Sequence, residues 1–67
     1  MCYRMMVPTQ VLALWDNHLA AVAVGPGDIV TLVGPDAQDE RFVLVMANGE
    51  KFHMFASDFT ERAMPIR

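Results

Sequence analysis

The sequence has a single cysteine, Cys2, so no disulfide can form within the chain. Zinc sites built on cysteine pairs are excluded for the same reason. A lone cysteine is typical of proteins in a reducing compartment, which makes the cytoplasm the expected location. A domain of 67 residues buries only about 60% of the surface that its unfolded chain exposes. Its stability must therefore come from one small hydrophobic core.

Charged residues are also scarce, at 19% of the chain against about 25% in an average soluble domain. Only five residues are Lys or Arg, and the formal net charge is −3. This balance argues against binding to nucleic acid through phosphate contacts. The alternative stays open if the fold brings together Arg41, Lys51, Arg62 and Arg67.

No uninterrupted apolar run approaches the roughly 20 residues that a transmembrane helix requires. The longest candidate, Val11 to Val24, contains Asp16, Asn17 and His18. The N-terminal MCYRMM has neither the apolar region nor the small-residue cleavage site of a signal peptide. A soluble, unexported protein with one domain, residues 1–67, is expected.

Hydrophobic residues, by contrast, make up 54% of the chain, more than a core of this size can hide. Part of this apolar surface is expected to meet a partner protein or a second copy of the chain.

The strongest structural signal is Asn48-Gly49 between the apolar runs FVLVM and KFHMF, which predicts a hairpin with a two-residue loop. Ala47 then faces Glu50, and Phe42 faces Phe55. Because side chains alternate, one face is wholly apolar and is the predicted core: Val43, Val45, Phe52 and Met54. The other face, which also carries Lys51, is the predicted partner-binding surface: Phe42, Leu44, Met46, His53 and Phe55.

The glycine-rich stretch VGPGDIVTLVGP, Val24 to Pro35, invites comparison with phosphate-binding loops. It lacks the Lys of a P-loop, and the β-branched run after Gly27 is typical of a strand rather than a helix. Gly25-Pro26-Gly27-Asp28 therefore predicts a turn that leads into a strand over Asp28 to Val33.

Residues 9–24 fit two structures. As a helix they form an apolar stripe, with Gly25-Pro26 at its end. As strands, 11–15 and 19–24 flank an Asp16-Asn17 turn, which the alternating AAVAV and the lack of charge on an outer helical face favour. Further on, Ser57 or Asp58 is the predicted N-cap of one helical turn, with Glu61 completing a capping box.

These elements predict a mainly β fold, a five-stranded antiparallel SH3-like or OB-like barrel with a short C-terminal helical turn. The alternative is an α+β fold, in which one N-terminal helix packs on a three-stranded antiparallel sheet.

Residues able to support catalysis are few. The carboxylates at positions 36, 39 and 40 lie in an acidic loop, and His18 and His53 show no triad spacing with them. Removal of Met1 would expose the amine and thiol of Cys2, which makes it a possible cofactor-contacting or thiol residue. We expect no enzyme activity, no metal and no bound cofactor.

Two resemblances accompany these observations. Gly27-Asp28 with its strand, Arg41 to Val45, the Asn48-Gly49 turn and Ser57-Asp58-Phe59 resemble KOW- and SH3-like small barrels, whose members bind proteins, RNA or DNA. This likeness implies an adaptor role.

Other residues, in order along the chain, resemble the hydrogenase-maturation chaperones of the HypC/HupF type: Met1-Cys2, Pro8, Val11 to Leu14, Ala21-Val22 and Val43-Leu44-Val45. That resemblance implies that Cys2 contacts a metallocofactor and a partner. The leading expectation remains a non-catalytic protein interaction module, with the chaperone and the nucleic-acid-binding barrel as alternatives.

Overall fold

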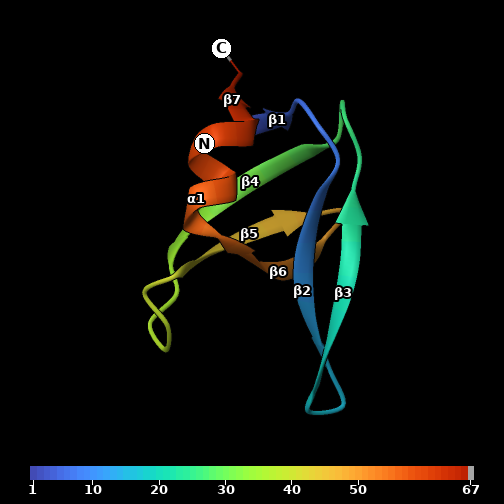
Figure 1. Cartoon of the computed structure of the whole chain (residues 1–67), viewed down its shortest axis with the longest axis vertical. Coiled ribbons are helices and arrows are strands. Elements are labelled where there is room, and N and C mark those ends of the chain that lie inside the picture. The colour runs from blue at the N-terminus through green and yellow to red at the C-terminus, as the bar shows by residue number, and fades with distance from the viewer. Residues whose placement is uncertain (67) are drawn as a thin grey trace.

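The computed structural model describes residues 1–66, and the side chains of these residues other than Trp15. Within them the chain forms one open antiparallel sheet with the strand order β3-β2-β6-β5-β4-β1-β7, and one short helix (Figure 1). The elements are β1 (Cys2–Met5), β2 (Thr9–Trp15), β3 (His18–Val24), β4 (Ile29–Pro35), β5 (Phe42–Ala47), β6 (Glu50–Phe55), α1 (Ala56–Arg62) and β7 (Ala63–Pro65).

The hairpin predicted around Asn48-Gly49 is confirmed as β5–β6. Ala47 pairs with Glu50 and Phe42 with Phe55, so the predicted register holds along the whole hairpin. Asn48 and Gly49 take positive φ angles of 53° and 79°, which a two-residue turn of type I′ requires. This register places Val45, Phe52 and Met54 on the buried face of the sheet.

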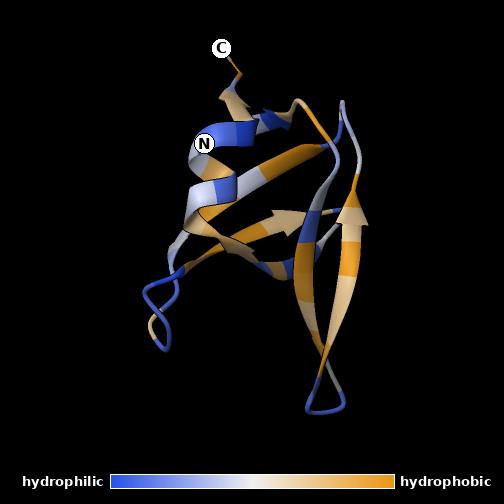
Figure 2. Cartoon of the chain, viewed as in Figure 1, coloured by the Kyte–Doolittle hydropathy of each residue, from blue (hydrophilic) through white to orange (hydrophobic). Residues whose placement is uncertain are grey.

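Residues 9–24 form the hairpin β2–β3, so the helical alternative is wrong. Asp16 and Asn17 form its turn with φ angles of 47° and 63°, and seven residue pairs follow without a bulge. A helix here would have had almost no charged face toward water. Figure 2 shows both strands coloured largely apolar, with a hydrophilic tip.

The core lies on the inner face of the bent sheet. Its members come from six of the seven strands. Each of these strands contributes only one or two residues, because its side chains alternate between the inner and the outer face. Met5, Val30, Val45 and Met54 have no solvent exposure at all. The remaining buried apolar residues are Val11, Val24, Ala47 and Phe52.

The predicted five-stranded barrel is wrong in both strand number and closure. MCYRMM contains β1, which pairs with β4 on one side and with β7 on the other. β1 has four residues and β7 has three, so neither is long enough for an alternating apolar pattern to predict a strand. The sheet stays open because β3 pairs with β2 alone within the described residues. The three-stranded α+β alternative is wrong for the same reasons.

The turn at Gly25 to Asp28 is confirmed. The Asp28 amide donates to the Gly25 carbonyl at 3.2 Å, and the Gly25 amide donates to Asp28 Oδ2 at 2.7 Å. Gly27 has a φ of 90°, as the third position of a type II turn demands. The Gly27 amide is bonded to the Met5 carbonyl at 2.8 Å, so this glycine-rich segment holds β1 in place.

The helix α1 is longer than the single turn expected, and its cap differs. It follows β6 directly, Phe55 is its N-cap, and no side chain caps it, so the predicted capping by Ser57 or Asp58 is wrong. Phe59 anchors it by an edge-to-face contact with Tyr3, with ring centroids 4.6 Å apart. Among the described residues no helix is long and apolar enough to cross a membrane.

Replacement of Gly49 tests the hairpin turn. Its φ of 79° is unfavourable for any residue with a Cβ, although nothing lies within 4 Å of that position. We expect Gly49→Ala to lower the free energy of unfolding by about 1–2 kcal/mol, measured by urea denaturation. Gly25→Ala is the control, because its added methyl group meets only Asp28 Oδ2 at 3.7 Å. A Gly49→Ala variant as stable as the control would contradict this account of the turn.

Candidate functional site

The outer face of the sheet carries a row of apolar side chains that is interrupted by His53. Leu12 pairs with Ala21 on one side and with His53 on the other, and His53 pairs with Leu44. Paired residues project to the same face, so these side chains line up across β3, β2, β6 and β5. This face lies opposite the core.

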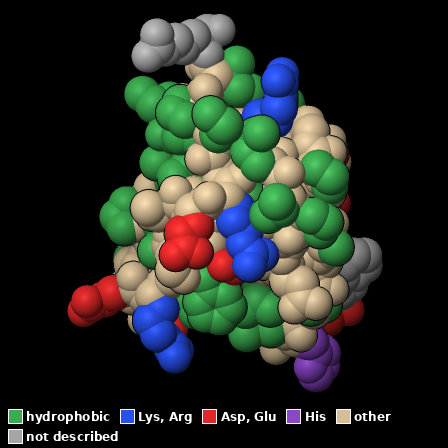
Figure 3. Space-filling model, turned by 45° about the horizontal axis from the view of Figure 1, so that its top comes forward, with side chains coloured by type: hydrophobic (Ala, Val, Ile, Leu, Met, Phe, Trp, Pro, Cys, Tyr) green, Lys and Arg blue, Asp and Glu red, His purple; other side chains and the backbone are tan. Residues whose placement is uncertain are grey.

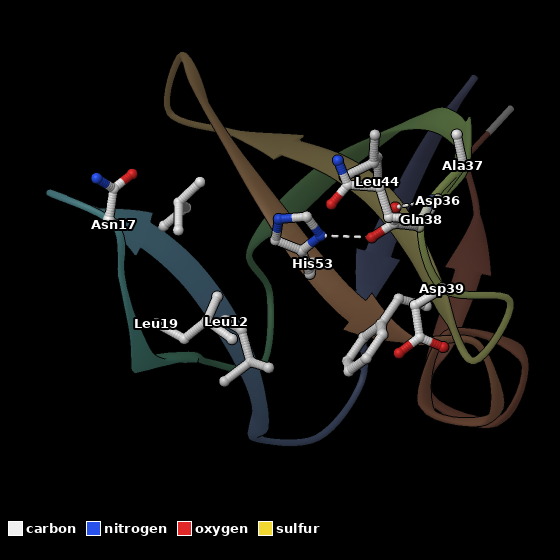
Figure 4. A pocket seen from close by; sticks show the side chains of 11 residues that line it. Leu12, Asn17, Leu19, Asp36, Ala37, Gln38, Asp39, Leu44 and His53 are labelled. Atoms are coloured by element: carbon white, nitrogen blue, oxygen red, sulfur yellow. Dashed lines mark hydrogen bonds and ion pairs between the residues drawn. The ribbon is translucent and has the colours of Figure 1, made fainter.

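A groove of about 620 Å³ lies along this face, open to solvent. We call it the leucine groove. It is formed by the hairpin β2–β3, by β5–β6 and by the loop between β4 and β5 (Figure 4). Its lining residues are Leu12, Leu14, Asn17, Leu19, Asp36, Ala37, Gln38, Asp39, Phe42, Leu44 and His53.

His53 and Asp36 form the polar centre of the groove. His53 Nδ1 lies 2.7 Å from Asp36 Oδ2, and the Asp36 side chain is only 8% exposed. An ionised carboxylate can only accept, so Nδ1 carries a proton and donates to it. On the other side of the imidazole ring, Figure 4 places Leu12, Leu19 and Asn17. This contact ties the β4–β5 loop to β6 and makes one wall of the groove.

Asp36 is held from its own loop as well. The Gln38 amide donates to Asp36 Oδ1 at 2.9 Å, an Asx turn. This bond, followed by the one from His53, lowers the pKa of the Asp36 carboxyl below its ordinary value. The carboxylate is therefore ionised throughout the neutral range.

An aromatic pair stands at the end of the groove next to α1. The rings of Phe42 and Phe55 lie 4.6 Å apart between centroids, and Phe42 meets His53 edge to face at 6.3 Å. The Arg41 guanidinium lies 5.8 Å from the Phe42 centroid and pairs with Asp39 at 2.8 Å. These contacts hold Phe42 in place as a groove wall.

The structure brings three of the five predicted partner-binding residues into the groove: Phe42, Leu44 and His53. Met46 is half-buried and pairs with Thr31 of β4, away from the groove. Phe55 is 43% exposed and lines a separate hollow beside Asp58 and Arg62.

Sequence reasoning missed the leucines and Asp36. Leu12, Leu14 and Leu19 were all within the predicted hairpin at residues 9–24, but their meeting with His53 depends on how the two hairpins pair. Asp36 resembled a solvated loop carboxylate. Asp36 follows Gly34-Pro35 and reads as an ordinary turn residue, so nothing in the local sequence indicates that its side chain reaches His53 on β6.

The alternative site residues lie apart from the groove. Cys2 is a free, exposed thiol within β1, and its Sγ is 3.7 Å from Thr31 Oγ1. His18 is exposed at the start of β3. No group of three or more His, Cys, Asp or Glu side chains that could hold a metal ion occurs in the described part of the chain.

The basic residues of the nucleic-acid alternative are partly engaged by acids. Arg41 pairs with Asp39, and Arg62 Nε lies 3.8 Å from Asp58 Oδ1. Lys51 is exposed at the start of β6, and Arg67 lies outside the described residues.

A second apolar patch lies at the β1–β7 end of the sheet. Figure 3 shows hydrophobic side chains gathered beside the C-terminal end of the chain. A shallow hollow there of about 290 Å³ is lined by Arg4, Met6, Met64, Pro65 and Ile66. It has no polar centre comparable to the His53–Asp36 pair.

Comparison of the chain with models of protein families, with curated proteins and with solved structures gives no match.

The Asp39–Arg41 pair predicts a specific acid sensitivity. The Arg41 side chain donates to both carboxylate oxygens of Asp39, and with the Arg41 amide it lowers the pKa of Asp39 from 3.8 to about 2. A lowered pKa in the folded state stabilises the fold above the unfolded value and loses that effect as the pH falls. We therefore expect Asp39→Asn to be less stable than the wild type near neutrality, with the difference closing between about pH 4 and pH 2.

Urea unfolding at a series of pH values measures this difference. Glu40→Gln is the control, since Glu40 is exposed and its loss changes the net charge by the same amount. Equal pH profiles for the two variants would show that net charge, and not the Arg41 contact, sets the acid response.

Proposed function

We propose that the chain is a non-catalytic protein interaction module that binds an apolar segment of a partner protein in the leucine groove. The observation that carries this proposal is the exposure of Leu14 and Leu19, 63% each, on a groove whose apolar lining continues through the half-buried Leu12, Leu44 and Phe42. Apolar concavities with a few polar groups at the centre are the usual form of binding sites.

The groove offers a partner both shape and orientation. Leu12, Leu44 and Phe42 supply apolar walls that an aliphatic or aromatic side chain can fill. The fixed His53 ring supplies a polar atom at the centre, because Nδ1 is held by Asp36 and Nε2 is not. An extended segment with one buried apolar anchor and a backbone group near His53 fits this arrangement.

Charge favours a basic flank on that segment. The loop that forms one wall contains Asp36, Asp39 and Glu40, and only Arg41 offsets them locally. The whole chain carries a formal charge of −3. Complementary charge near an apolar anchor speeds association and selects among partners.

The composition of the groove supports a binding role over a catalytic one. Its described lining includes His53 with Asp36, but no Ser, Thr, Cys or Lys that the histidine could activate. The groove is also open to water, whereas many active sites close around the substrate and expel water.

Selection of linear peptides from a random displayed library tests the proposal. We expect the peptides that bind the wild type to contain an apolar anchor with Lys or Arg nearby, and Leu14→Ser to weaken their binding about tenfold or more. Leu14 is 63% exposed, so the substitution should change the free energy of unfolding by no more than about 0.5 kcal/mol.

Met64→Ser is the matched control. Met64 is 53% exposed and lies on β7, at the opposite edge of the sheet from β3. Peptides that bind Leu14→Ser as tightly as the wild type, or a selection that yields no binder, would overturn the proposal.

A further inference from the structure

The edge of β3 that faces away from β2 is free of strand partners within the described residues, and it offers backbone groups, whereas the leucine groove, which Leu19 also lines, offers side chains. β3 spans His18–Val24 at one end of the strand order and pairs only with β2 within the described residues. Trp15 and His18 flank a two-residue turn, so they form a hydrogen-bonded pair, and such pairs recur at every second residue. The N–H and C=O groups of Leu19, Ala21 and Ala23 therefore point away from β2. Within the described residues β3 pairs with no strand other than β2, and no turn or loop hydrogen bond reaches these groups.

This edge carries none of the features by which proteins protect a free strand. Such features are charged side chains, proline, bulges and short length. β3 has seven residues, HLAAVAV, of which the first six are exposed, and its register with β2 is unbroken. The opposite edge of the sheet differs, because β7 has three residues and ends in Pro65. The sheet thus has one long unprotected edge and one short protected edge.

We propose that the edge of β3 pairs antiparallel with β3 of a second copy of this chain, which joins two sheets into one across a two-fold axis at Ala21. In this register each outward N–H and C=O of Leu19, Ala21 and Ala23 meets its counterpart in the other copy. Leu19 of one copy lies beside Ala23 of the other, and Ala20 beside Val22. Large side chains therefore face small ones on both faces of the joined sheet.

The charges near the edge are compatible with this pairing. His18 is the one titratable side chain in β3, and it falls opposite Val24 of the second copy. The next residue in that copy is Gly25, whose amide holds the Asp28 carboxylate at 2.7 Å. The imidazole of His18 thus lies beside the turn that holds this carboxylate, and Asp16, two residues earlier, belongs to the hairpin turn that leads back to β2.

The pairing closes at two copies and is reversible. Each copy uses its one long edge, so no equivalent edge remains for a third copy. A single strand pair buries less than the about 1,200 Å² of a standard interface, so the dimer should dissociate on dilution. The interface uses the backbone of β3, and it stands or falls separately from the groove.

Sedimentation equilibrium from about 10 µM to about 1 mM, a range that brackets weak association, tests the inference together with amide hydrogen exchange. We expect a shift from one copy to two with rising concentration. At high concentration the amides of Leu19, Ala21 and Ala23 should gain protection, whereas those of Ala20 and Val22, bonded to β2, are protected at both ends of the range.

Ala21→Lys places two like charges on the two-fold axis and should weaken self-association about tenfold or more, without breaking any bond to β2. Thr60→Lys, exposed on α1, adds the same charge elsewhere and should dimerise like the wild type. Mixing Ala21→Lys with Ala21→Glu should restore a dimer, which a misfolded variant cannot do.

Three results would overturn the inference. They are a monomer at about 1 mM, a dimer that Ala21→Lys leaves unchanged, and assemblies larger than two copies. Because Leu14→Ser leaves the β3 edge intact and the peptide assay reads the groove, failure of the dimer and failure of groove binding are distinguishable.

Discussion

The pairing of Leu12 with His53 is the contact on which the rest of this structure depends. It is the one backbone pairing that joins the hairpin β2–β3 to β6, and through β6 to the remaining strands of the described chain. Its position near the middle of β2 leaves the tip of the hairpin extended past the sheet. That extension creates both surfaces of interest, since it raises one wall of the leucine groove and leaves β3 as a free edge (Figure 1).

A polar contact stabilises this apolar arrangement. Asp36 reaches from the β4–β5 loop to His53, directly beside the Leu12 pairing, and it is almost fully buried there. A buried carboxylate without partners would be costly, but Asp36 accepts from both the Gln38 amide and His53. The loop is therefore held against β6 by hydrogen bonds, which leaves the leucine side chains uncovered and available to a partner.

The two edges of the sheet show how a small domain manages a shortage of core. The chain has 54% hydrophobic residues, and eight apolar residues of its described part form the buried core. β7 is short and contains proline, so it is a poor template for another strand. β3 is long, contains no Asp, Glu, Lys or Arg, and is exposed on both faces over most of its length. Apolar surface that the core cannot hold is thus exposed at both ends of the sheet, around β3 and around the β1–β7 patch, but only the β3 end also offers a long unpaired strand edge.

The local sequence determines the turns of the two hairpins. Asn48-Gly49 and Asp16-Asn17 favour positive φ, so each fixes a two-residue turn and with it the register and the facing of every side chain in its hairpin. The Gly25 to Asp28 turn follows from its own residues in the same way. The β5–β6 hairpin and this turn were predictable because they depend on residues within a few positions of one another, whereas residues 9–24 also fitted a helix and the structure shows them to be a hairpin.

Only the tertiary structure decides how the hairpins meet. β1 forms a strand because β4 and β7 lie on its two sides, and β7 forms one because β1 lies beside it. A run of three or four residues is too short for its own sequence pattern to predict these pairings. The groove likewise depends on Leu12 meeting His53 and on Asp36 reaching β6, contacts between residues far apart in the chain. Whether the sheet closes into a barrel depends on the same long-range pairing. The sequence by itself therefore determines the β5–β6 hairpin and its two faces, because turn geometry is local. The choice of a hairpin over a helix at residues 9–24, the open sheet, its groove and its free edge arise from packing between distant segments.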